Sequence, residues 1–265
     1  MIIIEELKNL PKENFSNPDY FLKIQELALD FIANFNIREA YSLAKILESK
    51  LSLHHEADAS LSDYRGLIIK LKFLALNCCN ENEILDLFEN SIADVLGDDD
   101  IDIINRLRAV MVEELITERD NLKRKIRERM LGNKQEITKS KLAADGKEKS
   151  GTVAHWLADY VRAVGAGEVD NIKVANYLTR NKNVFGLAPD EKEKISELIK
   201  VFNFLQTSSR TAEGLEEVLS FATSNGEVYS VRKGIVERVE REGAKFSTRR
   251  GIVSWEKPID ILRSE

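Results

Sequence analysis

The sequence contains few of the residues that cross-link or sharply bend a chain. Among 265 residues there are only two Cys, four Pro and 13 Gly. The cysteines, Cys78 and Cys79, are adjacent and offer no disulfide framework, so a reducing cytoplasm is the expected location. The shortage of Gly and Pro favours long helices with few turns. No apolar run approaches the roughly 20 residues that span a bilayer, so we expect no membrane insertion.

The same scarcity argues against common metal and catalytic sites. The soft ligands are the two cysteines, His54, His55 and His155, and their spacing matches no zinc motif. Nucleophilic catalysis by Cys–His or Ser–His needs a third, orienting group, and no such pattern is recognisable. These absences favour a protein without catalytic, cofactor-binding or metal-binding residues, although an enzyme whose site no motif reveals stays open.

Two short segments imitate ligand sites. The cluster Asp98–Asp100, with Asp102, could hold a divalent cation through carboxylate oxygens, but no calcium-loop pattern follows it. Capping of the next helix explains these acids without a metal. Residues 146–152 have the residue types of a phosphate-binding loop, but the spacing is wrong and no strand is expected before them.

Apolar residues at steps of three and four predict helices through the first half of the chain. Asn17-Pro18-Asp19 begins one helix, and its partner follows after Asn36, so the two pack antiparallel. The turns at 36–40 and 80–84 lie 44 residues apart, which is typical of an α-solenoid. The segment Leu27–Ala44 resembles a tetratricopeptide-like hairpin. An ordinary helical bundle is the alternative.

The stretch from Ile101 to Leu131 predicts one long helix that closes an acidic first domain, residues 1–131. Within this stretch the chain changes from acidic to basic. Residues 1–100 carry 9 Lys and Arg against 19 Asp and Glu, whereas residues 119–149 carry 11 against 5. The basic strip consists of Arg119, Lys123, Arg124, Lys125, Arg127 and Arg129. It could contact phosphates or an acidic protein surface. Alternatively, it is a solvated helix face whose cations suit the end of the helix dipole.

Residues 132–151 are polar, charged and short of large apolar groups, and we interpret them as a linker. A second helical domain is expected over residues 152–222. Its characteristic residues are Trp156-Leu157-Ala158-Asp159-Tyr160, Gly165, Gly167, Tyr177-Leu178 and Phe202-Asn203-Phe204-Leu205. With these residues the segment resembles a helical domain that recurs in uncharacterised proteins of uncultivated, small-genome bacteria. The resemblance implies a helical fold and carries over no functional residue.

A helix-turn-helix is an alternative interpretation of this second domain. Gly165–Gly167 would form the turn and Asp170–Leu178 the reading helix, and residues 175–200 resemble the last helices of a Lac-repressor-type domain. However, the predicted reading helix contributes only Lys173 as a cation, and residues 150–265 together are electrically neutral. A nucleic-acid reader normally has a basic footprint.

The tail, residues 223–265, differs again because β-branched residues replace leucine. The sequence Arg232-Lys233-Gly234-Ile235-Val236 recurs as Arg249-Arg250-Gly251-Ile252-Val253. This pattern fits a β-hairpin or a docking segment in which Trp255 is the anchor.

The sequence therefore predicts a mainly α fold of helical hairpins, a second helical domain and a tail with short strands. The favoured function is a non-catalytic protein–protein interaction or scaffold protein. The expected partner-binding residues are Arg119, Lys123, Arg124, Arg127, Ile252, Val253 and Trp255. The alternative is a nucleic-acid-associated regulatory factor that uses residues 119–149 and the second domain.

Overall fold

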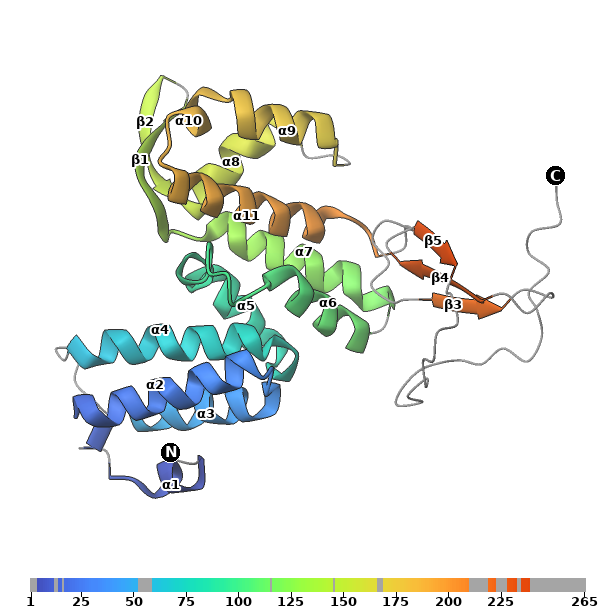
Figure 1. The fold of residues 1–265 in the computed structure, drawn as a ribbon. Coiled ribbons are helices and arrows are strands. Elements are labelled where there is room, and N and C mark those ends of the chain that lie inside the picture. Colours follow the sequence, from blue (N-terminus) through green and yellow to red (C-terminus); the bar gives the residue numbers. More distant parts are fainter. Residues whose placement is uncertain are drawn as a thin grey trace. The chain divides into compact units, whose positions relative to one another are not determined.

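The computed structural model divides into two compact units, residues 1–207 and 208–265. It describes residues 4–11, 14–15, 17–51, 59–114, 116–144, 146–165, 169–209, 219–222, 228–232 and 235–238. The fold is mainly helical with short antiparallel strands, as the sequence predicted (Figure 1). No helix in the described part of the chain is both long enough and apolar enough to cross a membrane.

The first core lies among four helices of unit 1. These are α1 (Ile4–Asn9), α2 (Pro18–Ala33), α3 (Ile37–Leu51) and α4 (Ala59–Leu74). Asn17 caps α2 by accepting a hydrogen bond from the Asp19 amide at 2.9 Å, as its sequence predicted. The helices α2, α3 and α4 lie side by side in Figure 1 and bury Leu27, Leu43 and Leu71 between them.

The second core is built from elements that follow α4. They are η2 (Leu76–Cys78), α5 (Glu81–Asn90), η3 (Ile92–Asp94), α6 (Ile103–Glu113), α7 (Ile116–Gly132), β1 (Glu136–Ala144), β2 (Lys147–Thr152), α8 (Val153–Val164), α9 (Asn171–Arg180), α10 (Lys182–Phe185) and α11 (Pro189–Gln206). Helix α7 is central to this core because it packs against α5, α8 and α11. Phe88, Ile126, Trp156 and Phe202 bring these elements into one cluster. In an α-solenoid, neighbouring hairpins share one continuous core. Here α4 and α5 contribute mainly to different cores, so the repeat of hairpins stays a prediction.

The long helix predicted over residues 101–131 is wrong in one respect, because the chain leaves the helix at Glu114. There the backbone is extended, with φ −84° and ψ 153°. The Glu114 carbonyl accepts a hydrogen bond from Arg119 Nε at 3.1 Å instead of one within a continuous helix. The apolar steps of three and four continue on both sides of the break, which is why periodicity alone did not reveal it.

The interpretation of residues 132–151 as a linker is also wrong. Most of this segment belongs to an antiparallel hairpin, in which Ala144 pairs with Lys147 and Glu136 with Thr152. Ile137 and Leu142 face the second core, while most of the charged side chains of the hairpin are exposed. A half-buried strand needs few apolar residues, so a low apolar content was compatible with order.

Tertiary contacts hold this hairpin in unit 1. Buried Glu191, in the first turn of α11, accepts hydrogen bonds from the Lys139 amide at 2.6 Å and the Ser140 hydroxyl at 3.1 Å. Trp156 Nε1 donates to the Thr138 hydroxyl at 3.0 Å. Residues 1–207 therefore form one compact unit, and the boundary predicted within 132–151 is not a division between units.

Unit 2 contains a three-stranded antiparallel meander. Its strands are β3 (Leu219–Ala222), β4 (Val228–Arg232) and β5 (Ile235–Arg238), in the order β3-β4-β5. In the first copy of the repeated tail motif, Arg232 ends β4, Ile235 and Val236 belong to β5, and Arg232 pairs with Ile235. The second copy, with Ile252 and Val253, lies outside the described residues, as does Trp255.

Candidate functional site

The basic strip of α7 is largely paired within unit 1. Lys125 Nζ lies 2.6 Å from Glu81 Oε1, and Arg129 lies 2.5 Å from Glu89, so two cations join α7 to α5. Arg124 pairs with Glu128 one turn along α7, at 2.7 Å. These carboxylates neutralise the cations locally, which makes the exposed side of α7 a poor phosphate-binding surface.

Two of the predicted partner-binding cations are interior residues. Arg119 and Lys123 are only 2% and 1% exposed. Lys123 donates a hydrogen bond to the Thr207 carbonyl at 3.2 Å and lies 4.7 Å from the centre of the Phe204 ring. The alkyl stem of Lys123 fills space between α7 and the end of α11. Neither residue is accessible to a partner in this structure.

Arg124 and Arg127 come together at a groove of about 240 Å³. The apolar part of its lining includes Leu131, Val161 and Phe202. Arg127 Nε is buried there and has no hydrogen-bond acceptor among the described residues. The groove also contains Glu128, the carboxylate that pairs with Arg124, so it presents cations and an acid together and has no clear charge preference.

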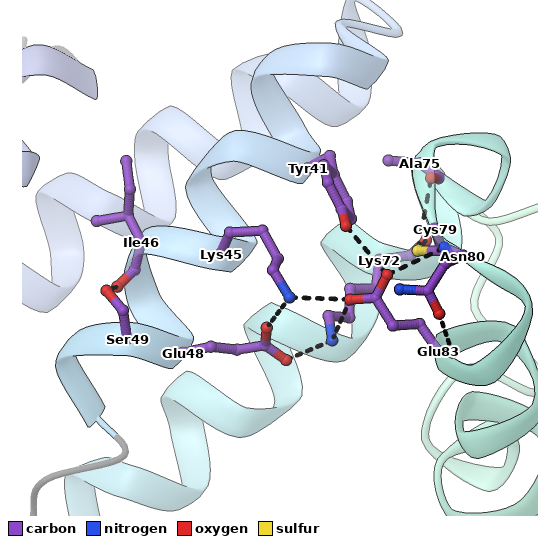
Figure 2. A network of polar contacts seen from close by, with 10 residues as sticks. All are labelled: Tyr41, Lys45, Ile46, Glu48, Ser49, Lys72, Ala75, Cys79, Asn80 and Glu83. Carbon is purple, nitrogen blue, oxygen red and sulfur yellow. Dashed lines mark hydrogen bonds and ion pairs between the residues drawn. The ribbon is translucent and has the colours of Figure 1, made fainter.

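A polar network joins α3 and α4 to α5 (Figure 2). Glu83 accepts hydrogen bonds from Lys45 at 2.9 Å, Tyr41 at 3.0 Å and the Asn80 amide at 3.0 Å. Burial by itself would raise the pKa of Glu83, but these donors outweigh it and lower the pKa to about 2. The Lys72 ammonium lies 3.7 Å from the same carboxylate. Every partner is a residue of this chain, so the network attaches α5 to the first core.

The other segments considered from the sequence also have structural roles. Asp98 pairs with Lys70 at 2.7 Å, and Asp102 caps α6 by accepting from the Asn105 amide at 3.0 Å. His155 Nδ1 lies 2.9 Å from the Ser150 carbonyl. Burial raises the pKa of the Cys79 thiol to about 12, which suppresses thiolate chemistry.

The remaining metal-ligand candidates gain no support from the structure. His54 and His55 lie outside the described residues. In the part of the chain that the structure describes, no three His, Cys, Asp or Glu side chains gather as a metal site would require.

A further candidate surface lies on α9, the helix that the sequence suggested as the reading helix of a helix-turn-helix. Asp170 caps this helix by accepting from the Ile172 and Lys173 amides, at 2.9 and 3.2 Å. Only one flank of α9 packs inward, through buried Tyr177 and half-buried neighbours. The rest is solvent-exposed, and the side chain of Ile172 is 75% exposed. On the following helix α10, Phe185 is 72% exposed.

A pocket of about 300 Å³ opens between α8 and this helix. It is lined by Ala163, Lys173, Asn176, Tyr177, Arg180 and Asn181. Lys173 and Arg180 are exposed, and within the described ranges neither side chain has an acceptor or a carboxylate partner. The pocket therefore offers two available cations, with an exposed amide between them.

The floor of the pocket is fixed by a buried hydrogen-bond network. The Tyr177 hydroxyl donates to Asp159 Oδ2 at 3.0 Å, and Asn183 Nδ2 donates to the same oxygen at 3.2 Å. Burial raises the pKa of Tyr177, and the neighbouring Asp159 carboxylate adds to this. Asp159 is thus satisfied from within the fold, and α9 is held firmly against α8.

A sequence signal for this surface existed. Residues 171–188 contain three cations, Lys173, Arg180 and Lys182, and no acid. The helix predicted from the sequence ended at Leu178 and therefore contained Lys173 as its only cation. The helix continues to Arg180, which places the second cation two turns from the first on the same side.

Comparison with protein-family models, with curated proteins and with solved structures found no significant match to this chain. The resemblances drawn from the sequence to a tetratricopeptide-like hairpin and to a bacterial helical domain therefore stay predictions.

Proposed function

We propose that this chain is a non-catalytic interaction or scaffold protein of the cytoplasm, and that the outer face of α9 and α10 contacts its partner. The observation that carries the proposal is that two large apolar residues, Ile172 and Phe185, are 75% and 72% exposed. Both lie in residues 171–188, which contain no Asp or Glu. Large exposed apolar side chains beside available cations are typical of contact surfaces.

The shifted ionisable groups support a binding role over a catalytic one. Glu83, with its lowered pKa, joins α3 to α5, and Tyr177, with its raised pKa, holds Asp159. A catalytic acid or base must instead reach a substrate proton in a cleft. These groups are engaged by the fold, so their pKa shifts are explained without catalysis.

Affinity capture from native-cell extract tests the proposal. The full chain is compared with the double variant Ile172→Glu/Phe185→Glu, and with Leu22→Glu as a control at another exposed leucine, 55% exposed on α2. We expect the wild-type protein and the control to capture the same partner and the double variant to lose it. Equal capture by all three forms would refute α9–α10 as the contact surface.

A role in nucleic-acid binding is a second candidate, favoured by one observation. One side of α9 exposes Lys173, Asn176 and Arg180, and Asn, Lys and Arg are residue types that read base edges. The pairing of the α7 cations argues against the extended basic footprint that this role needs. Fluorescence anisotropy with duplex DNA at about 150 mM salt separates the candidates. Submicromolar binding that Arg180→Ala abolishes would favour the nucleic-acid role.

A further inference from the structure

The pocket between α8 and α9 holds two cations that no described carboxylate balances. Several other cations of unit 1, such as Lys70, Lys125 and Arg129, lie within 2.7 Å of a carboxylate. Lys173 and Arg180 have no such partner among the described residues. Because both cations line one pocket, a ligand that carries two negative charges can pair with both.

The spacing of the two cations restricts that ligand. Lys173 and Arg180 are seven positions apart on α9, which corresponds to about 10.5 Å along the helix axis. A peptide in the polyproline II conformation has three residues per turn and advances about 3.1 Å per residue, so acids three positions apart point to the same side and lie about 9 Å apart. Asn176 lies between the cations, and its side-chain amide can both donate to and accept from a peptide backbone.

The shape of the pocket favours a peptide over an enclosed small molecule. Its volume of about 300 Å³ is at the lower end for small-molecule sites. Ala163 contributes only a methyl group on the α8 side, and most of the lining is exposed. Ile172 is next to Lys173 and 75% exposed, so it can contact an apolar side chain beside the acids.

We infer that the pocket binds an acidic segment of a partner protein in the polyproline II conformation, with two carboxylates three residues apart seated on Lys173 and Arg180. The inference rests on the proposed interaction function and names the partner's chemistry. Nucleic acid fits less well, because two cations on a chain of net charge −6 neutralise few phosphates. A carboxylate pair needs only these two charges, each held by a charge-assisted hydrogen bond.

The test uses the full chain and an array of fluorescein-labelled peptides with the pattern Glu-x-x-Glu followed by leucine. A matched array carries Gln in place of Glu. Fluorescence anisotropy measures binding to the wild-type protein, to Lys173→Glu/Arg180→Glu, and to Lys182→Glu. Lys182 is an appropriate control because it is exposed and close in sequence but does not line the pocket.

We expect Glu peptides to bind the wild-type protein and Lys182→Glu alike, and the double variant at least tenfold more weakly. The Gln array should bind at least tenfold more weakly to the wild-type protein, and added salt should weaken binding of the Glu array. In a ¹⁵N-labelled sample, the Asn176 side-chain amide signals should shift on titration with the best peptide.

Four results would each overturn the inference: no peptide binds, Glu and Gln peptides bind equally, the Lys182 control loses as much affinity as the double variant, or the Asn176 signals do not move. Tighter binding of duplex DNA, lost in the double variant, would assign the pocket to nucleic acid. Sedimentation showing self-association that the double variant abolishes would assign it to a second copy of the chain. If the peptides fail while capture still depends on Ile172 and Phe185, the interaction function survives and the pocket assignment fails.

Discussion

Replacing Glu83 by a neutral residue should show how much the charge of its carboxylate contributes to the free energy of unfolding, apart from the packing of α5. The pKa of this carboxyl lies at about 2, against an ordinary 4.5, although its side chain is only 14% exposed. At about 1.36 kcal/mol per pH unit, the difference corresponds to about 3 kcal/mol in favour of the ionised folded state. Lys45 is 48% exposed, so solvent screening makes this an upper figure.

The sign of the effect fixes its pH dependence. Because folding lowers the pKa of Glu83, its contribution to stability is present above pH 4.5 and lost as the pH falls toward 2. By pH 3, linkage predicts that about 2 kcal/mol of it has disappeared. Acid should therefore weaken the attachment of α5 to the first core.

Urea unfolding of the wild-type protein and Glu83→Gln at pH 7 and pH 3 measures this contribution. We expect Glu83→Gln to lower the free energy of unfolding by about 2–3 kcal/mol at pH 7 and by about 1 kcal/mol at pH 3. Glu81→Gln is the control on the same helix, because its ion pair is half exposed and should be worth less than about 1 kcal/mol. A difference that stays constant between the two pH values would refute the electrostatic account.

Two further variants test, by urea unfolding, the hairpin formed by β1 and β2 and the buried position of Lys123. Gly151→Ala should destabilise the protein by about 3 kcal/mol, because the new Cβ would collide with the Thr138 hydroxyl and carbonyl in the hairpin. The control Gly66→Ala meets no neighbouring atom within 4 Å and should be neutral or stabilising by up to about 1 kcal/mol; equal effects at both sites would count against an ordered hairpin. Lys123→Ala should cost about 3 kcal/mol through lost packing and a lost buried hydrogen bond, whereas exposed Arg124→Ala should cost less than about 1 kcal/mol. Equal costs would mean that Lys123 is a surface residue after all.

The parts of the fold that the sequence predicted correctly depend on neighbours in the chain. Asn17 caps α2 through an amide two residues away. Helix periodicity is likewise a short-range signal. The mainly helical class and most helix positions could therefore be read from local patterns.

The hairpin over residues 136–152 could not be read in this way. Its order depends on Glu191 and Trp156, which lie 18 to 52 residues along the chain from the hairpin groups they bind. Thr138 and Gly151 are polar or small, so their close packing leaves no apolar pattern in the sequence. Composition alone therefore suggested a linker where tertiary hydrogen bonds hold two strands.

The two basic segments explain why the predicted and observed sites differ. On α7, cations dense enough to suggest a binding surface find Glu81 and Glu89, each about 40 residues earlier in the chain. On α9, fewer cations stand in a stretch with no acid, and no described carboxylate reaches Lys173 or Arg180. The density of positive charge along the sequence therefore does not show which cations lack an internal counter-charge. That depends on which distant helices pack together, so the sequence could show the acid-free stretch around α9 but not the pairing of the α7 cations with α5.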